Sequence, residues 1–211
     1  MKKNQVILIY GLPATGKYTM AKRLKEDNGI LLDNHYFHDM FAHSTEVPKE
    51  ELPQYWSAVG KLKKQFIEIL RQFYPKSKKV RYIFTSVLMK GETLPARLEQ
   101  FAHDIQADFI PIELVARNAV LKKRCQTEYR KARKKISSAD SMEKFLEDHK
   151  DDLPDYTHPN KLWIDVSALN EDETFSAIQK HLEKLDGEGN EQQRNNIEKR
   201  KESLTPPYSR G

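Results

Sequence analysis

The chain has 211 residues, of which 38% are hydrophobic and 32% charged, and a formal net charge of +5, which predicts one globular domain with an added polar segment. It has no apolar run of about 18 residues and no cleavable leader pattern, so we expect no membrane span and a cytoplasmic location. The single cysteine, Cys125, excludes an internal disulfide framework, and its spacing from Leu121 and Tyr129 predicts a buried apolar residue rather than a nucleophile.

The first expected element is a buried strand over residues 6–10, followed by a glycine-bounded loop and then a helix. This order is that of a phosphate-binding P-loop, in which backbone N–H groups and the helix N-terminus form a nest for an anion. The side chain of Lys17 can reach the β- and γ-phosphates of a nucleotide. The residues expected to bind the nucleotide are Gly11, Pro13, Ala14, Thr15, Gly16, Lys17, Tyr18 and Thr19. The alternative is an ordinary turn between a strand and a helix, without a ligand.

Tyr18 stands where the P-loop pattern has serine or threonine, whose hydroxyl binds Mg²⁺. A phenol is too long and too bulky to take that place directly. Thr19 follows, but successive helical residues are about 100° apart, so its hydroxyl cannot simply replace the missing one. A phosphate site that binds Mg²⁺ weakly, or through other groups, is therefore a further alternative.

Beyond the P-loop, strands and helices alternate along the chain. Short apolar runs predict the other strands, over residues 30–33, 80–88, 109–115 and 162–166. Apolar residues at helical spacing predict helices near residues 52–74, 94–105, 116–130, 140–149 and 175–185. Pro111 cannot donate a hydrogen bond to a central ladder, so we expect the fourth strand to begin near Ile112. The basic residues 131–138 are typical of a mobile loop.

This alternation predicts an α/β fold with a parallel sheet, helices on both faces and the P-loop strand in the middle. Ligands bind beyond the carboxyl ends of such strands, so the polar residues 33–39 are expected near the P-loop. Residues 122–135 carry eight basic side chains and one acidic one, and we favour a functional role over a solvated helix face. Residues 186–211 contain few large apolar groups, which predicts a tail that is disordered or ordered by a partner.

Three stretches, GLPATGK, LLDNH and LKKRCQTEYR with its following basic loop, resemble small P-loop kinases of the shikimate kinase and chloramphenicol phosphotransferase type. Some members of that group are loosely described as AAA-family ATPases. The resemblance covers residues 5–185 and implies a three-layer P-loop NTPase fold with a five-stranded parallel sheet and a small lid at residues 126–140. The predicted organisation is a kinase-like domain over residues 1–185 and a polar tail over residues 186–211.

The resemblance also implies roles for residues at the strand ends. Asp33 would lie near the acceptor hydroxyl and the metal, where it could orient or deprotonate the acceptor, although a helix N-cap is the alternative. Thr19 is a second, weak candidate for the metal. His35 replaces the family's second acid, which indicates a different acceptor, with a surface histidine as the alternative. No aspartate ends the third strand, so Thr85 or Ser86 would contact substrate or metal-bound water.

In the lid, Arg124, Arg130 and Arg133 match by location the arginines with which this family closes on the phosphates. Bidentate guanidinium groups suit a transferring phosphoryl group, whose charge spreads over three oxygens. Arg117 would stack on adenine or lie at the surface. Together with Lys17 and the strand-end aspartate, the lid arginines are the expected catalytic residues, and ATP and Mg²⁺ are the expected cofactors.

The expected function is ATP-dependent transfer of the γ-phosphate to a hydroxyl of a small molecule. One alternative is a kinase or binding protein that acts on nucleic acid through the basic lid, although the lid lacks interleaved aromatic residues. Another is a nucleotide-binding interaction protein without turnover, suggested by Tyr18 and by a tail that could bind a protein partner. Residues 160–163 lack the aspartate of a guanine-reading motif, so a GTPase switch is not expected.

Overall fold

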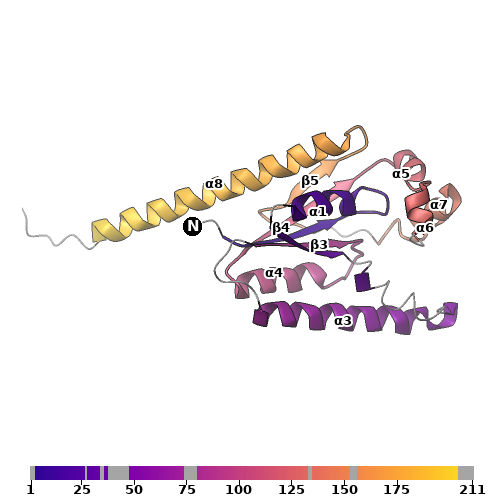
Figure 1. Cartoon of the computed structure of the whole chain (residues 1–211), viewed down its shortest axis with the longest axis horizontal. Helices are drawn as coiled ribbons and strands as arrows, with labels where there is room; N and C mark the ends of the chain where they lie inside the picture. The colour runs from indigo at the N-terminus through magenta and orange to yellow at the C-terminus, as the bar shows by residue number, and fades with distance from the viewer. Residues whose placement is uncertain are drawn as a thin grey trace, which may run out of the picture.

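The computed structural model describes residues 3–26, 28–33, 36–37, 48–73, 80–132, 135–152 and 156–203. Figure 1 shows an α/β body from which the C-terminal helix projects. The strands are β1 (Gln5–Tyr10), β2 (Gly29–Asp33), β3 (Arg81–Ser86), β4 (Asp108–Val115) and β5 (Leu162–Asp165). The helices are α1 (Lys17–Lys25), the 3-10 turn η1 (Lys49–Glu51), α3 (Leu52–Phe73), α4 (Leu94–Asp104), α5 (Asn118–Arg124), α6 (Glu128–Ala132), α7 (Ala139–Asp148) and α8 (Glu171–Ser203).

The strands form one parallel five-stranded sheet in the order β2-β3-β1-β4-β5, with the P-loop strand β1 in the middle. The predicted sheet and the central place of its first strand are confirmed. In the register of the sheet, Asp33 pairs with Thr85, and Tyr10 pairs with Ser86. The carboxyl ends of β2, β3 and β1 therefore lie side by side, next to the loop that follows Tyr10.

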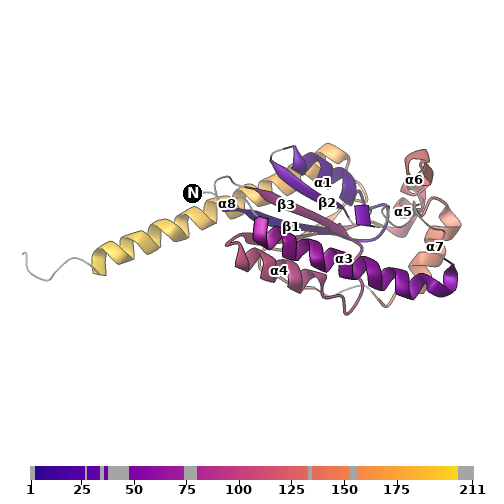
Figure 2. The same ribbon diagram turned by 60° about the horizontal axis from the view of Figure 1, so that its bottom comes forward.

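The two faces of the sheet are covered by different helices, as Figures 1 and 2 show. Successive side chains of a strand point to opposite faces, so β1 contributes to both sides of the core. The cluster on the face of α3 and α4 includes Val6, Leu8, Ile67, Leu98 and Phe101. The cluster on the face of α1 and α8 includes Ile7, Ile9, Leu24, Ile178 and Leu182. Each such side chain stabilises the fold by about 1.5–3 kcal/mol through burial, and together they fix the sheet on which the P-loop is mounted.

The strand β4 includes Pro111, so the expectation that it begins near Ile112 is wrong. The reason is that β5 pairs with β4 only from Ile112 onward. The carbonyl of Phe109 faces the β5 edge, where it accepts a hydrogen bond from Asn160 Nδ2 at 3.1 Å. Strand alternation places the nitrogen of Pro111 on that same edge, ahead of the first β4–β5 pair, so the missing N–H removes no ladder bond there.

Residues 116–130 do not form the single predicted helix, because α5 ends at Arg124 and α6 begins at Glu128. The chain turns back at Cys125, which is fully buried with Leu121 and Met142 of α7. The Cys125 Sγ lies 3.1 Å from the Lys122 carbonyl oxygen and 3.3 Å from that of Ser138. Burial of this cysteine is confirmed, and packing against α7 explains why the helix breaks.

The segment predicted as a lid, residues 126–140, contains α6 and the start of α7, and α5 precedes it (Figure 1). α7 matches the helix predicted over residues 140–149, and Ser138 caps it by accepting a hydrogen bond from Ser141 N at 3.1 Å. α6 extends to Ala132, so residues 131 and 132 are helical and not part of a loop as predicted. Leu12 and Ala14 of the P-loop pack against the small apolar cluster around Cys125. The lid region is thus built directly onto the P-loop.

The helix α8 continues to Ser203, into the segment for which the sequence predicts a tail that is disordered or ordered by a partner. Its core contacts end near Leu182 and the half-buried Leu185, and the rest projects beyond the sheet in Figure 1. Extending an existing helix needs no new nucleus, and Glu, Gln, Lys and Arg are good helix formers. The polar composition therefore does not prevent helix formation. Residues 204–211 lie outside the described part of the chain.

Within the described residues, the structure contains no helix that is both long enough and apolar enough to cross a membrane.

Candidate functional site

The loop between β1 and α1 has the backbone shape of an anion nest. Gly11 and Gly16 have φ angles of 141° and 92°, in the region that favours glycine. At Gly11 a Cβ would lie 2.1 Å from the Leu114 carbonyl oxygen, so glycine alone fits beside β4. Thr15 is buried and donates a hydrogen bond to the Leu12 carbonyl at 3.0 Å. These contacts hold the loop at the N-terminus of α1, where backbone N–H groups can bind phosphate.

Lys17, the first residue of α1, folds back along this loop. Its Nζ donates hydrogen bonds to the carbonyl oxygens of Gly11, at 2.8 Å, and Leu12, at 2.7 Å. Burial, together with the positive charges of Arg130 and Lys135, lowers the pKa of Lys17 to about 7, although the negative charge of Asp33 acts in the opposite direction. Two lid cations and one strand-end carboxylate therefore act electrostatically on the P-loop lysine.

Tyr18 is turned toward the lid. Its ring stacks on that of Tyr129 in α6, with centroids 6.5 Å apart and planes at 27°. A tyrosine that stacks in this way does not supply the small hydroxyl that a P-loop presents to Mg²⁺. In the described part of the chain, no group of three or more His, Cys, Asp or Glu side chains is arranged to hold a metal ion.

Asp33, Thr85 and Ser86 lie together at the carboxyl ends of β2 and β3, as their predicted roles require. All three are buried, and Asp33 is 1% exposed. Asp33 and Thr85 are direct neighbours in the register, and Ser86 is the neighbour of Tyr10, the last residue before the P-loop. The negative charge of Asp33 raises the pKa of Lys17. The residue that follows Asp33 by two positions, His35, lies outside the described residues.

The lid arginines differ in their surroundings. Arg130 donates through Nε to the Ile136 carbonyl at 2.8 Å, and its charge acts on Lys17. Burial lowers the pKa of Arg130 itself. Arg124 instead donates through Nη2 to two backbone carbonyls of the segment after β5, those of Val166 at 2.9 Å and Leu169 at 3.2 Å. Arg130 is thus next to the P-loop, Arg124 ties the lid to β5, and Arg133 lies outside the described residues.

Arg117 is exposed and lies at the N-terminus of α5, just after β4. Its backbone N–H donates to Ser167 Oγ at 2.8 Å. The neighbouring Val166 N–H donates to the Val115 carbonyl at 2.8 Å. The segments after β4 and after β5 therefore run side by side, with the Arg117 backbone at their contact, and stacking of its side chain on an adenine stays a prediction.

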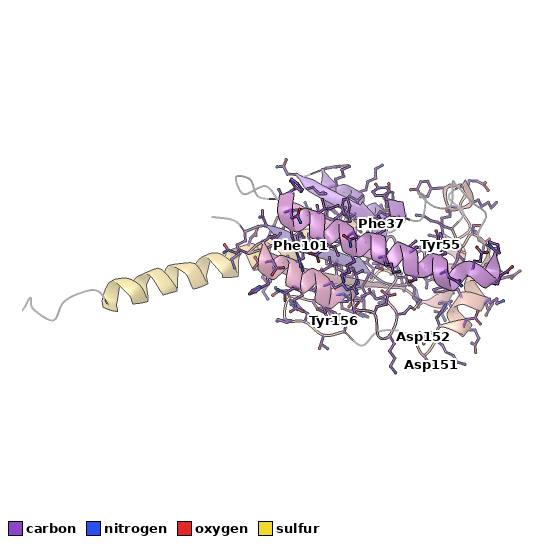
Figure 3. All side chains as sticks on the ribbon, turned by 90° about the horizontal axis from the view of Figure 1, so that it is seen from below. Phe37, Tyr55, Phe101, Asp151, Asp152 and Tyr156 are labelled. Carbon is purple, nitrogen blue, oxygen red and sulfur yellow. The ribbon has the colours of Figure 1, made fainter. Side chains whose placement is uncertain are left out.

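Two further contacts involve connecting segments, and Figure 3 labels a residue of each, Phe37 and Asp152. Phe37, which follows β2, packs edge-on against Phe66 of α3 with centroids 5.7 Å apart. The Lys90 N–H, after β3, donates to the carbonyl of Asp152, after α7. The segment after β2 thus contacts α3, and the segment after β3 contacts the one after α7.

Sequence reasoning missed two residues of the site, Lys135 and Tyr129. Lys135 lies in the basic block that the sequence singled out, but nothing in that block distinguishes it from its neighbours. Tyr129 has the spacing of a core residue from Cys125, yet it is 49% exposed and faces Tyr18. Which side chains of residues 122–135 lie near the P-loop depends on the break between α5 and α6, which the sequence does not reveal.

No family model matches the chain, and no curated protein matches it significantly. Solved structures do match over most of its length. A protein from Chloroflexus aurantiacus, provisionally named a kinase, has a TM-score of 0.63 at 18% identity over 87% of this chain and 98% of its own. A gluconokinase from Sinorhizobium meliloti has 0.55 at 12% identity, over 90% and 98%. A shikimate kinase from Bacteroides thetaiotaomicron has 0.50 at 16% identity, over 86% and 98%. The chain has the fold of the small P-loop kinases, as the sequence predicted.

Proposed function

We propose that the chain is an ATP-dependent phosphotransferase that moves the γ-phosphate of ATP to a hydroxyl of a small molecule. The observation that carries this proposal is the position of Lys17, whose Nζ donates to the P-loop carbonyls of Gly11 and Leu12 and whose pKa is shifted by the charges of both Asp33 and Arg130. A phosphate nest alone would support nucleotide binding. A buried carboxylate and a lid cation beside it add the two groups that phosphoryl transfer uses.

The nucleotide would be held by the loop from Gly11 to Lys17 and by residues at its borders. Backbone N–H groups of the nest would bind the β-phosphate, and Lys17 would exchange its two carbonyl partners for phosphate oxygens. Arg117 would lie against the base, above the junction of the segments after β4 and β5. Thr19 and Tyr18 would border the phosphates at the start of α1.

A magnesium ion accompanying the nucleotide would neutralise phosphate charge, and the residue that fits it is Asp33. Carboxylate oxygen is a ligand that Mg²⁺ prefers, and much of its remaining coordination normally comes from water and phosphate. Thr19, the residue that follows Tyr18 in α1, is a second, weaker candidate. This donor set is small, which agrees with a site that depends on protein cations for much of its charge neutralisation.

The acceptor would bind beside Asp33, Thr85 and Ser86, between the P-loop and the segments near α3. Asp33 would accept the proton of the acceptor hydroxyl or orient that hydroxyl toward the phosphate. The hydroxyls of Thr85 and Ser86 would position the acceptor or a water molecule. Arg130 would donate to the phosphoryl oxygens, where charge develops in transfer, while the lid excludes water.

A small hydroxylated acceptor is supported by the sequence resemblance and by the named activities of two similar structures, a gluconokinase and a shikimate kinase. His35, in place of a second acid, favours an acceptor different from shikimate. The test is ATP consumption with Mg²⁺ in the presence of pooled sugars, nucleosides, aminoglycosides and hydroxylated acids. We expect one pool to stimulate turnover and Lys17→Ala to abolish it, whereas equal turnover without any pool would count against a kinase.

A second candidate is a nucleotide-binding interaction protein without turnover. Two observations favour it: the ring of Tyr18 is stacked on Tyr129, and α8 projects from the body as a long polar helix. It predicts ATP binding that no metabolite converts to turnover. The basic block 122–135 would also permit a nucleic-acid acceptor, which predicts binding that weakens steeply with salt.

A further inference from the structure

The lid is joined to the first turn of α1 by two tyrosines and a lysine. Tyr18 stacks on Tyr129 of α6, and Tyr18 also packs partly against the apolar cluster under α1. The Nζ of Lys135 lies 5.3 Å from the centroid of the Tyr18 ring and 5.7 Å from that of Tyr129. Both distances fall within the roughly 6 Å over which a ring face attracts a cation. One ammonium group is therefore shared between a ring of the P-loop helix and a ring of the lid.

This arrangement places positive charge where a phosphate would bind. The charges of Lys135 and Arg130 both lower the pKa of Lys17, so three basic side chains lie near one another at the P-loop. Mutual repulsion would drive such cations apart unless other groups hold them. The two tyrosine rings hold Lys135, the Ile136 carbonyl holds Arg130, and the Gly11 and Leu12 carbonyls hold Lys17. The folded protein therefore holds these mutually repelling groups in place before an anion binds. Such a site is preorganised for a ligand with several negative charges.

We propose that Tyr18 and Tyr129 form an aromatic latch that holds Lys135 over the P-loop as a further phosphate-binding residue. This inference rests on the proposed function, because its ligand is the polyphosphate of the nucleotide. Tyr18 occupies the position of the metal-binding hydroxyl, so the latch supplies a fixed protein cation at the point where the chain lacks a metal ligand. Tyr18 is then a positioning residue, and Lys135 is the group that touches the phosphate.

The test measures binding of a non-hydrolysable ATP analogue by calorimetry, once with Mg²⁺ and once with excess EDTA. The wild type is expected to keep most of its affinity in EDTA. Lys135→Gln should lose about tenfold in EDTA, because a charge-assisted contact to phosphate is lost. Lys135→Arg keeps the positive charge and should therefore bind the analogue in EDTA about as tightly as the wild type. Tyr18→Leu should lose a similar factor, since the ring face is gone while apolar volume remains, and Tyr18→Phe should bind like wild type.

The matched control is Lys131→Gln, which removes the same charge from the same lid. Lys131 is exposed, and its Nζ lies 2.6 Å from Glu128 Oε1, away from the latch. A coupled latch also predicts that Lys135→Gln adds little to Tyr18→Leu, because either change releases the same ammonium group. An effect of Lys135→Gln no larger than that of Lys131→Gln, or losses that simply add in the double variant, would overturn the proposal.

A second readout needs no nucleotide. Amide hydrogen exchange in residues 128–132 of the ligand-free protein should be faster in Tyr18→Leu than in the wild type or Tyr18→Phe. Unchanged exchange would overturn the latch. If no variant, the wild type included, bound the ATP analogue, the proposed function would fall and Lys135 would lose its phosphate role, while the exchange difference would still report on the aromatic contact.

Discussion

Lys17 Nζ lies 2.8 Å from the carbonyl oxygen of Gly11, the residue that opens its own loop. The ammonium group thus spans the loop that it would use to bind phosphate. Burial and two lid cations lower its pKa to about 7, so near neutral pH the group is only partly protonated. Binding an anion must reverse this balance, because negative charge favours the ammonium form. Nucleotide binding is therefore linked to protonation of Lys17.

Proton uptake on nucleotide binding is the first prediction. With the free pKa of Lys17 near 7, the side chain is mostly neutral at pH 8 and mostly charged at pH 6. The bound phosphate raises that pKa, so uptake should approach one proton at pH 8 and shrink toward pH 6. Phosphate itself ionises near pH 6, so its own titration is small at pH 8. Calorimetry in buffers of different ionisation enthalpy measures the protons taken up.

The control for this linkage is Lys17→Arg, because a guanidinium group stays charged throughout this range. Any binding that this variant retains should occur without pH-dependent uptake. Equal uptake by the arginine variant and the wild type would show that another group titrates.

Asp33→Asn is expected to lower turnover by about 10²–10⁴-fold, the usual contribution of a general base. The amide keeps the shape of the carboxyl group at the buried end of β2 but cannot accept the proton. Affinity for an ATP analogue without metal should not fall, because a negative charge near the phosphates is removed. Asp108→Asn is the matched control, since Asp108 lies at the other end of the sheet in an exposed ion pair with Lys3. Unchanged turnover in Asp33→Asn would remove this residue from the chemistry.

Arg124 and Arg130 should respond differently to replacement by glutamine. Arg124→Gln removes the donor to the carbonyls of Val166 and Leu169, so we expect the free energy of unfolding to fall by about 1–3 kcal/mol. Arg130→Gln should instead lower nucleotide affinity or turnover by about tenfold or more, with a smaller change in stability. Thermal unfolding and kinetics of both variants measure the contrast, and the reverse pattern would exchange their assigned roles.

Removal of residues 187–211 should leave thermal stability and nucleotide binding unchanged. The core contacts of α8 come before that point, and Asp186, which accepts a hydrogen bond from Gln5 Nε2 at 3.3 Å, is kept. Leu182→Ala provides the contrast, because this buried side chain should cost about 2–5 kcal/mol when truncated. A small-molecule kinase keeps its activity in the shortened chain, whereas an interaction protein loses its partner.

The P-loop and the sheet could be predicted from sequence because each follows from local pattern. Gly11, Gly16 and Lys17 occur at fixed spacing after an apolar run, and the alternation of elements constrains the order of a parallel sheet. The proximity of Asp33 to Thr85 then follows from the register. These relationships depend on the backbone, which short patterns determine well.

The lid could not be predicted in the same way, because its shape depends on tertiary packing. Helical periodicity continues past Arg124, but α5 ends there, where Cys125 is buried with Met142 of α7. That break decides that Arg124 reaches β5 while Lys135 reaches the P-loop. The contact between Tyr18 and Tyr129 could not be predicted either, because the two residues are far apart in sequence and only the tertiary structure brings them together.

The most direct test of the account follows a label from the γ-phosphate of ATP in a mixture of small metabolites, with wild-type protein and with Lys17→Ala. The account predicts that label appears on a hydroxyl of one metabolite class with the wild type and on none with Lys17→Ala. Label that appears only as inorganic phosphate, or that is transferred equally by both proteins, would contradict it.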